Sequence, residues 1–157
     1  MVDVGLSPDF RDLLVALVDA EAEFVLIGGW AMALYGHGRG TDDMDVLVRP
    51  SQQNAERVFK ALLEFGAPVA AHGVTPALFA EGRYGYRMGQ KPNLIELLTT
   101  VNGITFEEAR TDARLFELDG RRIPYIGRAA LLKNKRAAGR PKDLADVAWL
   151  EAHPEEE

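Results

Sequence analysis

The stretch RGTDDMDVLV, residues 39–48, places three carboxylates immediately before an apolar run. Successive side chains on a strand point to opposite faces, so Asp43 and Asp45 are predicted to share one face. Asp42 and Met44 then point to the other face. Two neighbouring carboxylates repel each other in a partly buried setting, and a cation between them relieves that repulsion. The pattern therefore predicts a cation site, and the alternative interpretation is a solvated strand end.

A third acid lies within another apolar run, NLIELLT at residues 93–99. Glu96 is the one charged residue of this run, where an unpaired charge is costly. Carboxylate oxygens suit Mg²⁺, which takes one or two protein carboxylates together with waters and substrate phosphates. A third carboxylate near such a pair can bind a second ion or activate an attacking hydroxyl. The competing interpretation is a strand position at which Glu96 faces the solvent.

Two glycines, Gly28 and Gly29, follow the apolar run FVLI and precede the helix-forming run WAMALYG at residues 30–36. Glycine lets the backbone approach a ligand closely, and the first turn of a helix offers free N–H groups to a phosphate. The spacing matches neither the dinucleotide-binding glycine pattern nor a P-loop. A phosphate cradle is one interpretation, and a turn that needs glycine for steric reasons is the other.

Basic residues gather late in the chain. Residues 121–142 hold eight lysines and arginines and no acid, although the net charge of the whole chain is −6. Such a band can attract phosphates locally, or it can be a solvated helix face. Lys142, Asp143 and Asp146 follow within one helical turn of one another, so they can reach overlapping sides of the last helix or form simple surface pairs.

The elements that position these residues follow from hydrophobic periodicity, caps and turn signals. Helices are predicted at residues 8–20, 30–36, 51–66, 104–110, 128–138 and 141–152, with Ser7 and Ser51 as caps. Strands are predicted at residues 24–29, 43–49, 83–89 and 93–99, with a β-hairpin over 113–127 that turns at Asp119-Gly120. This order predicts an α+β (mixed α/β) fold with a sheet of about five strands flanked by helices, two of them C-terminal.

The bulk composition limits the class of protein. The chain has 157 residues, 47% hydrophobic and 27% charged, which predicts a single globular domain over 1–157. Cysteine is absent from the sequence, which excludes disulfides and cysteine-bound zinc. The net charge of −6 argues against wholesale coating of nucleic acid. We expect no secretory signal, no membrane span and a cytoplasmic location.

Residues 26–48, LIGGWAMALYGHGRGTDDMDVLV, resemble the signature of the nucleotidyltransferase superfamily typified by DNA polymerase beta. There, a Gly-Gly or Gly-Ser turn opens a helix, and an Asp-x-Asp pair follows on the next strand. The closer resemblance is to small prokaryotic nucleotidyltransferase-like proteins related to the AbiEii-like toxins of type IV toxin–antitoxin systems. These carry an Arg-x-Thr-x-Asp-x-Asp stretch and a late Arg-x-Lys-Asp-x-x-Asp stretch. The matching residues here are Arg39, Thr41, Asp43 and Asp45, and then Arg140, Lys142, Asp143 and Asp146.

The resemblance covers most of residues 24–151 and implies transfer of a nucleoside monophosphate from a nucleoside triphosphate to an acceptor hydroxyl. It implies Mg²⁺ as cofactor, as two ions, with Mn²⁺ as a substitute. Asp43, Asp45 and Glu96 would hold the metal and, with Lys135, form the catalytic set. The implied nucleotide-binding residues are Gly28, Gly29, Trp30, Arg39, Thr41, Lys133, Arg140, Lys142, Asp143 and Asp146.

Two positions depart from the superfamily pattern. Glu96 stands where Asp is more common, and Trp30 stands where many members have a serine that contacts phosphate. A catalytically weak nucleotide-binding or partner-binding module of the same fold is therefore the alternative function, and acids that merely solubilise a sheet edge are a third interpretation. For the enzyme, the acceptor is open among tRNA, a partner protein and a small molecule, and the oligomeric state is open too.

Overall fold

The elements begin and end close to where the sequence predicts. The computed structural model describes residues 6–37, 43–82 and 85–155, so the roles predicted for Arg39, Thr41 and Asp42 lie outside the described residues. The helices are α1 (Pro8–Asp19), α2 (Gly28–Leu34), α3 (Gln52–Phe65), α4 (Pro76–Ala80), α5 (Phe106–Thr111), α6 (Arg128–Ala138) and α7 (Pro141–Ala152). The strands are β1 (Phe24–Ile27), β2 (Asp43–Val48), β3 (Gly85–Met88), β4 (Leu94–Leu98), β5 (Arg114–Leu118) and β6 (Arg121–Tyr125).

Local caps account for several of these boundaries. The Ser7 hydroxyl accepts a hydrogen bond from the Phe10 backbone N–H at the start of α1, and the Ser51 hydroxyl accepts one from Asn54 at the start of α3. Each bond satisfies an N–H group that the first turn of a helix leaves without an intrahelical partner. Both serine caps were predicted from the sequence and are confirmed.

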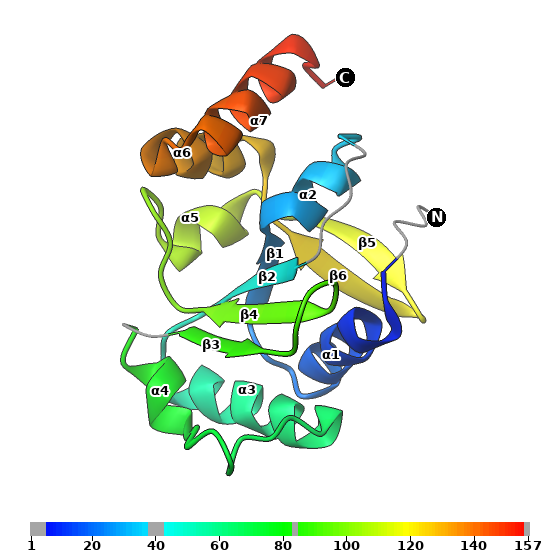
Figure 1. The fold of residues 1–157 in the computed structure, drawn as a ribbon, viewed down its shortest axis with the longest axis vertical. Helices are drawn as coiled ribbons and strands as arrows, with labels where there is room; N and C mark the ends of the chain where they lie inside the picture. Colours follow the sequence, from blue (N-terminus) through cyan, green and yellow to red (C-terminus); the bar gives the residue numbers. More distant parts are fainter. Residues whose placement is uncertain (1–5, 38–42, 83–84, 156–157) are drawn as a thin grey trace.

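All six strands join one mixed sheet in the order β3-β4-β2-β1-β6-β5 (Figure 1). The β2–β4 and β1–β6 pairs are parallel, and the other neighbouring pairs are antiparallel. Because β2 and β4 are parallel neighbours, the chain leaves β2, passes through α3, α4 and β3, and returns beside it. This crossover places the acids of two distant sequence segments on adjacent strands.

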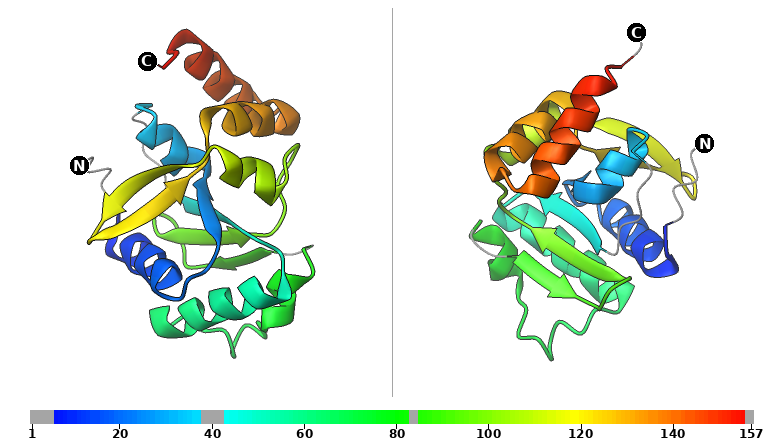
Figure 2. Two further views of the ribbon diagram at one scale, coloured as in Figure 1. Left: turned by 180° about the vertical axis from the view of Figure 1, so that it is seen from behind. Right: turned by 45° about the horizontal axis from the view of Figure 1, so that its top comes forward.

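The helices cover the two faces of the sheet in separate layers. Helices α1, α3 and α4 pack on one face, whereas α5, α6 and α7 lie beyond the other (Figures 1 and 2). Figure 2 shows α6 and α7 side by side, on the opposite side of the sheet from α3. Each face therefore has its own core. The first includes Leu14, Met44, Val46, Val58 and Leu97, and the second includes Val25, Ile27, Leu47, Leu131 and Leu150.

The predicted α+β fold with C-terminal helices is confirmed, with one strand more than the predicted five. Both strands of the predicted hairpin belong to the central sheet, because β6 pairs with β1. The helix predicted from residue 30 begins two residues earlier, at Gly28. Alternation along β2 sends Met44 and Val46 into the first core, so Asp43 and Asp45 face the side of α6 and α7.

Candidate active site: a charged pocket between the sheet and the C-terminal helices

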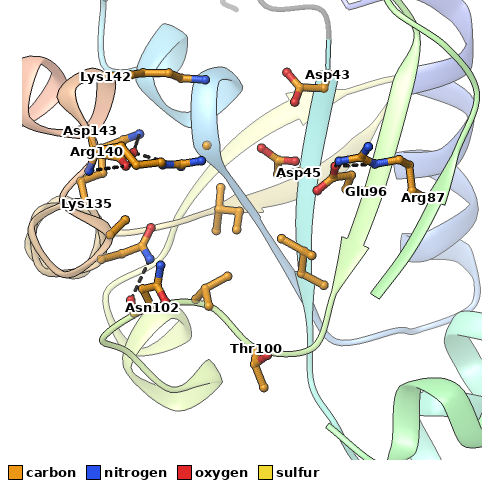
Figure 3. Close-up of a pocket in the computed structure, with 16 residues that line it drawn as sticks. Asp43, Asp45, Arg87, Glu96, Thr100, Asn102, Lys135, Arg140, Lys142 and Asp143 are labelled. Carbon is orange, nitrogen blue, oxygen red and sulfur yellow. Dashed lines mark hydrogen bonds and ion pairs between the residues drawn. The ribbon is translucent and has the colours of Figure 1, made fainter. Parts of the chain in front are cut away.

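Three carboxylates meet on the face of the sheet that looks toward α6 and α7. Asp43 and Asp45 are half-buried and line the same pocket, as strand alternation predicts, while Met44 is fully buried on the opposite face. In the parallel pairing of β2 with β4, Asp45 lies directly opposite Glu96. We call Asp43, Asp45 and Glu96 the sheet wall of the pocket (Figure 3). The solvated-strand-end interpretation therefore does not describe these acids.

Like charges crowd the centre of the sheet wall. Burial is the largest influence on Asp45, and the neighbouring charges of Asp43 and Glu96 add to it, so the pKa of Asp45 rises from 3.8 to about 6. The positive charges of Lys142 and Lys135 oppose this rise without cancelling it. A carboxylate in this setting gains from a nearby cation, because the cation favours its ionised form.

Gly28 stands against the sheet wall. Its φ of +68° is in the left-handed region, and a Cβ at this position would lie 2.5 Å from Oδ2 of Asp45. Glycine is therefore required here both by backbone conformation and by space. Of the two glycines, Gly28 lines the pocket, whereas Gly29 does not. The steric interpretation of the glycine pair is correct at Gly28, and the group that needs the space is the Asp45 carboxylate.

Trp30, which the resemblance assigns to the nucleotide, has its side chain elsewhere. The indole is buried in the core shared with α1, and its ring meets Phe10 edge-on with centroids 5.9 Å apart. It does not line the charged pocket. The side chain lies away from the pocket because a large aromatic ring gains more from burial beside α1 than from the pocket rim. The role of Trp30 as the start of a helix that would cradle the triphosphate stays a prediction.

The opposite wall of the pocket comes from α6 and the start of α7. Lys135 is only 5% exposed, and its Nζ lies 2.9 Å from Oδ2 of Asp146 and 3.7 Å from Oδ1 of Asp143. Asp146 is completely buried. A buried ammonium held by two carboxylates is a fixed structural unit, since removal of Lys135 would leave buried carboxylates without their ammonium partner. The alternative interpretation of simple surface pairs within the last helix therefore does not hold for Asp146, which is buried and pairs with Lys135 of α6.

Asp143 links this buried unit to the pocket. Its carboxylate accepts from the backbone N–H of Arg140 at 3.3 Å and from Arg140 Nε at 2.7 Å, which caps α7. Burial by itself raises the pKa of Asp143. The hydrogen bond and charge of Arg140, together with the charge of Lys135, lower it by more than burial raises it. The net pKa lies below the ordinary value. Asp143 is therefore ionised at neutral pH and orients Arg140.

Arg140 and Lys142 carry the positive charge of this side toward the acids. The Arg140 side chain is 70% exposed, Lys142 is exposed, and Figure 3 shows both side chains directed across the pocket toward Asp43 and Asp45. We call Lys135, Arg140, Lys142 and Asp143 the helical wall. Part of the basic band predicted from the sequence therefore lines the pocket, and the rest of the band does not.

Lys133 lies outside the pocket, although the sequence groups it with Lys135. Its Nζ pairs with Oε2 of Glu108 at 2.6 Å on the exposed side of α6. Residues two apart on a helix point in very different directions, so one of the two lysines had to face away. Neither Lys133 nor Asp146 lines the pocket, and the nucleotide-binding roles assigned to them stay predictions.

The pocket between the walls has a volume of about 490 Å³ and continues beyond the charges. Its uncharged part includes Leu98, Thr100, Asn102 and Asn134, and Asn134 Nδ2 donates to the backbone carbonyl of Asn102 at 2.8 Å. The sequence did not predict Thr100, Asn102, Asn134 or Arg87 as pocket residues.

Arg87 on the edge strand β3 is the direct cross-strand partner of Glu96. Its guanidinium donates from Nε to Oε1 of Glu96 at 2.8 Å and from Nη2 to the same oxygen. Glu96 is therefore not a solvent-facing strand residue, since it lies between Arg87 and Asp45 in one row of side chains.

The donor chemistry of the sheet wall fits a hard divalent cation. Within the described part of the chain, no group of three or more His, Asp or Glu side chains is set to hold a metal ion. The Asp43–Asp45 pair supplies two carboxylates on one face, and the like charges that raise the pKa of Asp45 are the condition that a cation relieves. Mg²⁺ accepts such a pair when waters and phosphate oxygens complete its shell.

Over residues 6–37, 43–82 and 85–155, no helix combines the length and the apolar character needed to cross a membrane. No model of a known protein family matches the chain, and none of the curated proteins compared with it shows significant similarity.

Proposed function

We propose that this chain is a Mg²⁺-dependent nucleotidyltransferase of the cytoplasm, which moves a nucleoside monophosphate from a nucleoside triphosphate to an acceptor hydroxyl. One observation carries the proposal: carboxylates on the sheet wall face Arg140 and Lys142 on the helical wall across a single pocket. A metal–triphosphate complex needs both kinds of group, because the metal takes carboxylate oxygens and the phosphates take cations.

Asp43 and Asp45 would hold Mg²⁺, or Mn²⁺ in its place, with Glu96 as a third carboxylate for a second ion. When bound, the metal would supply charge neutralisation at the phosphates and favour the reactive form of the acceptor hydroxyl. Arg140 and Lys142 would bind phosphate oxygens from the opposite side and hold the triphosphate in line. Lys135, fixed by Asp143 and Asp146, would keep one positive charge at a constant position on the wall.

The reaction balances without a further reagent. The acceptor oxygen forms a bond to the α-phosphorus, and the bond from that phosphorus to the pyrophosphate oxygen breaks. Pyrophosphate leaves toward the cations of the helical wall, and the hydroxyl proton passes to a carboxylate of the sheet wall. Positioning and charge stabilisation supply most of the rate in phosphoryl transfer, and the two walls provide both. The acceptor is a tRNA, a partner protein or a small molecule, and a toxin–antitoxin role is compatible with each.

A second candidate is a nucleotide-binding or partner-binding module with weak turnover. The observation that favours it is the ion pair of Glu96 with Arg87, which engages the third carboxylate. Trp30 also stands where the superfamily pattern has a serine that contacts phosphate, so that hydroxyl is missing here.

Calorimetry with each nucleoside triphosphate, with and without Mg²⁺, tests the binding step. We expect Mg²⁺ to strengthen nucleotide binding. Asp43→Asn or Asp45→Asn should remove this gain and so lower the affinity measured with Mg²⁺ by about 100-fold. Glu56→Gln, on the exposed side of α3, is the matched control and should bind as the parent does. Binding that is indifferent to Mg²⁺ and to both aspartates would reject the metal-dependent enzyme.

Labelled nucleoside triphosphates added to a cell extract test turnover. Label transferred to a macromolecule or small molecule by the parent, and not by Asp43→Asn, supports the enzyme. Mg²⁺-dependent binding without any transfer favours the binding module.

A further inference from the structure

Arg87 and Glu96 form an ion pair at the rim of the charged pocket. Arg87, Glu96 and Asp45 lie in register on β3, β4 and β2, so their side chains form one row on the same face (Figure 3). Arg87 donates both hydrogen bonds to Oε1 of Glu96. Among the described residues, no donor forms a hydrogen bond with Oε2. Glu96 therefore stands between a guanidinium on one side and the Asp45 carboxylate on the other.

The two partners differ in how firmly they are held. The Glu96 side chain is 19% exposed, whereas the Arg87 side chain is 69% exposed. An exposed guanidinium gains little net free energy from an ion pair, because water screens the attraction and the long side chain loses rotamer freedom. A divalent cation beside Asp43 and Asp45 carries twice the charge and is drawn by three carboxylates instead of one. The cation therefore has the advantage in a competition for Glu96.

We infer that Arg87 is a displaceable counter-ion, for which a divalent cation at the Asp43–Asp45 pair competes as partner of Glu96. The inference rests on the proposed function for the identity of the cation. Displacement requires only rotation of the Arg87 side chain, because the β3–β4 hydrogen-bond ladder fixes the backbone of both residues. Arg87 is thus a positioning residue that acts through Glu96 and sets how readily the third carboxylate joins the metal site.

Mn²⁺ binding, followed by electron paramagnetic resonance on the full chain without nucleotide, measures the competition. We expect Arg87→Met to tighten Mn²⁺ binding about five-fold, because the cation then no longer competes with a guanidinium for the Glu96 carboxylate. In a Glu96→Gln background the same substitution should change the affinity less than two-fold, because the carboxylate for which the ions compete is gone. Arg122→Met, an exposed arginine of β6 outside the pocket, is the matched control and should leave the affinity unchanged.

An equal gain in both backgrounds would show that Arg87 acts only through its long-range field, and it would overturn the inference. So would the absence of any gain. If Asp45→Asn abolishes Mn²⁺ binding while the Arg87–Glu96 cycle shows no coupling, the inference fails and the proposed function stands. If neither the parent nor Arg87→Met binds Mn²⁺, the metal-dependent function fails and the inference fails with it.

The Arg87 Nε–H signal in ¹⁵N-edited NMR spectra gives a readout that does not depend on affinity. We expect Mg²⁺ to move this signal to the position that it has in Glu96→Gln, where no ion pair can form. A signal that stays in place at saturating Mg²⁺ would show that Arg87 keeps its bonds to Glu96, and it would overturn the displacement.

Discussion

The two walls of the charged pocket are built in opposite ways. On the helical wall, Lys135 is enclosed by Asp143 and Asp146, and Asp143 also binds Arg140, so opposite charges neutralise one another within the protein. On the sheet wall, Glu96 pairs with Arg87, but three carboxylates still stand together, and burial with two neighbouring carboxylates raises the pKa of Asp45. The first arrangement stabilises the fold. The second costs stability, and under the proposed function a cation from outside would relieve that cost.

Under the proposed function, this difference separates structural charges from charges that would bind a ligand. Carboxylates with perturbed pKa values in a pocket are characteristic of functional sites, because they lower the stability of the fold and folding alone does not explain their presence. Because the charges of one wall stabilise the fold and those of the other cost stability, substitutions on the two walls should change the free energy of unfolding in opposite directions.

The largest effect is expected from Lys135→Met. The substitution keeps the length of the side chain but leaves Asp143 and Asp146 buried without their ammonium partner. Loss of one member of a buried ion cluster costs about 3–5 kcal/mol. Urea unfolding at pH 7 should show a loss of this size. A loss below about 1 kcal/mol would mean that the cluster is not a structural unit.

A smaller effect, of opposite sign, is expected from Asp45→Asn. Because the folded pKa of Asp45 is about 6 and the unfolded value is near 3.8, the folded state holds this proton more tightly between those values. The contribution of Asp45 to stability is therefore complete below about pH 4 and falls as the pH rises through 6. Without divalent cations, Asp45→Asn should be more stable than the parent by up to about 3 kcal/mol at pH 8 and equal to it near pH 4.

Urea unfolding of both proteins at the two pH values, with EDTA present, checks this sign. An Asp45→Asn variant that is no more stable than the parent at pH 8 would contradict the picture of a strained sheet wall. Saturating Mg²⁺ should stabilise the parent and leave Asp45→Asn nearly unchanged, since only the parent retains both carboxylates.

The smallest effect is expected from Lys133→Met, which sharpens the contrast within α6. Lys133 pairs with Glu108 on the solvent side, and surface pairs of this kind contribute little. We expect no measurable shift in the unfolding midpoint and less than a two-fold change in nucleotide affinity by calorimetry. A marked loss of affinity would show that a bound nucleotide extends beyond the pocket to this face of the helix.

The sequence predicted most of the fold because its local signals agree with one another. The helix after Ser51 and the hairpin at Asp119-Gly120 carry caps, periodicity and turn residues that point to the same elements. The strand order was not predictable in this way. The pairing of β1 with β6 joins segments far apart in the chain, and no local pattern of residues encodes such a partner.

The same distinction between local and non-local signals applies to the residues of the site. Strand alternation was enough to separate Asp43 and Asp45 from Met44, because side-chain direction on a strand is a local property. The direction of Lys135 rather than Lys133 into the pocket depends on how α6 packs on its neighbours, and the role of Arg87 depends on the register between β3 and β4. Periodicity shows that the two lysines diverge, but it does not show which of them is buried.

The crossover between β2 and β4 also governs when the pocket forms during folding. Asp45 and Glu96 become neighbours only after residues 49–93 have closed a long loop, and such non-local closure is slow compared with helix or hairpin formation. Partly folded chains therefore lack the paired acids, and a divalent cation bound there, as proposed, would recognise only the completed sheet. On this reasoning, the ion would slow unfolding more than it speeds folding, because its binding energy is gained only after the rate-limiting pairing.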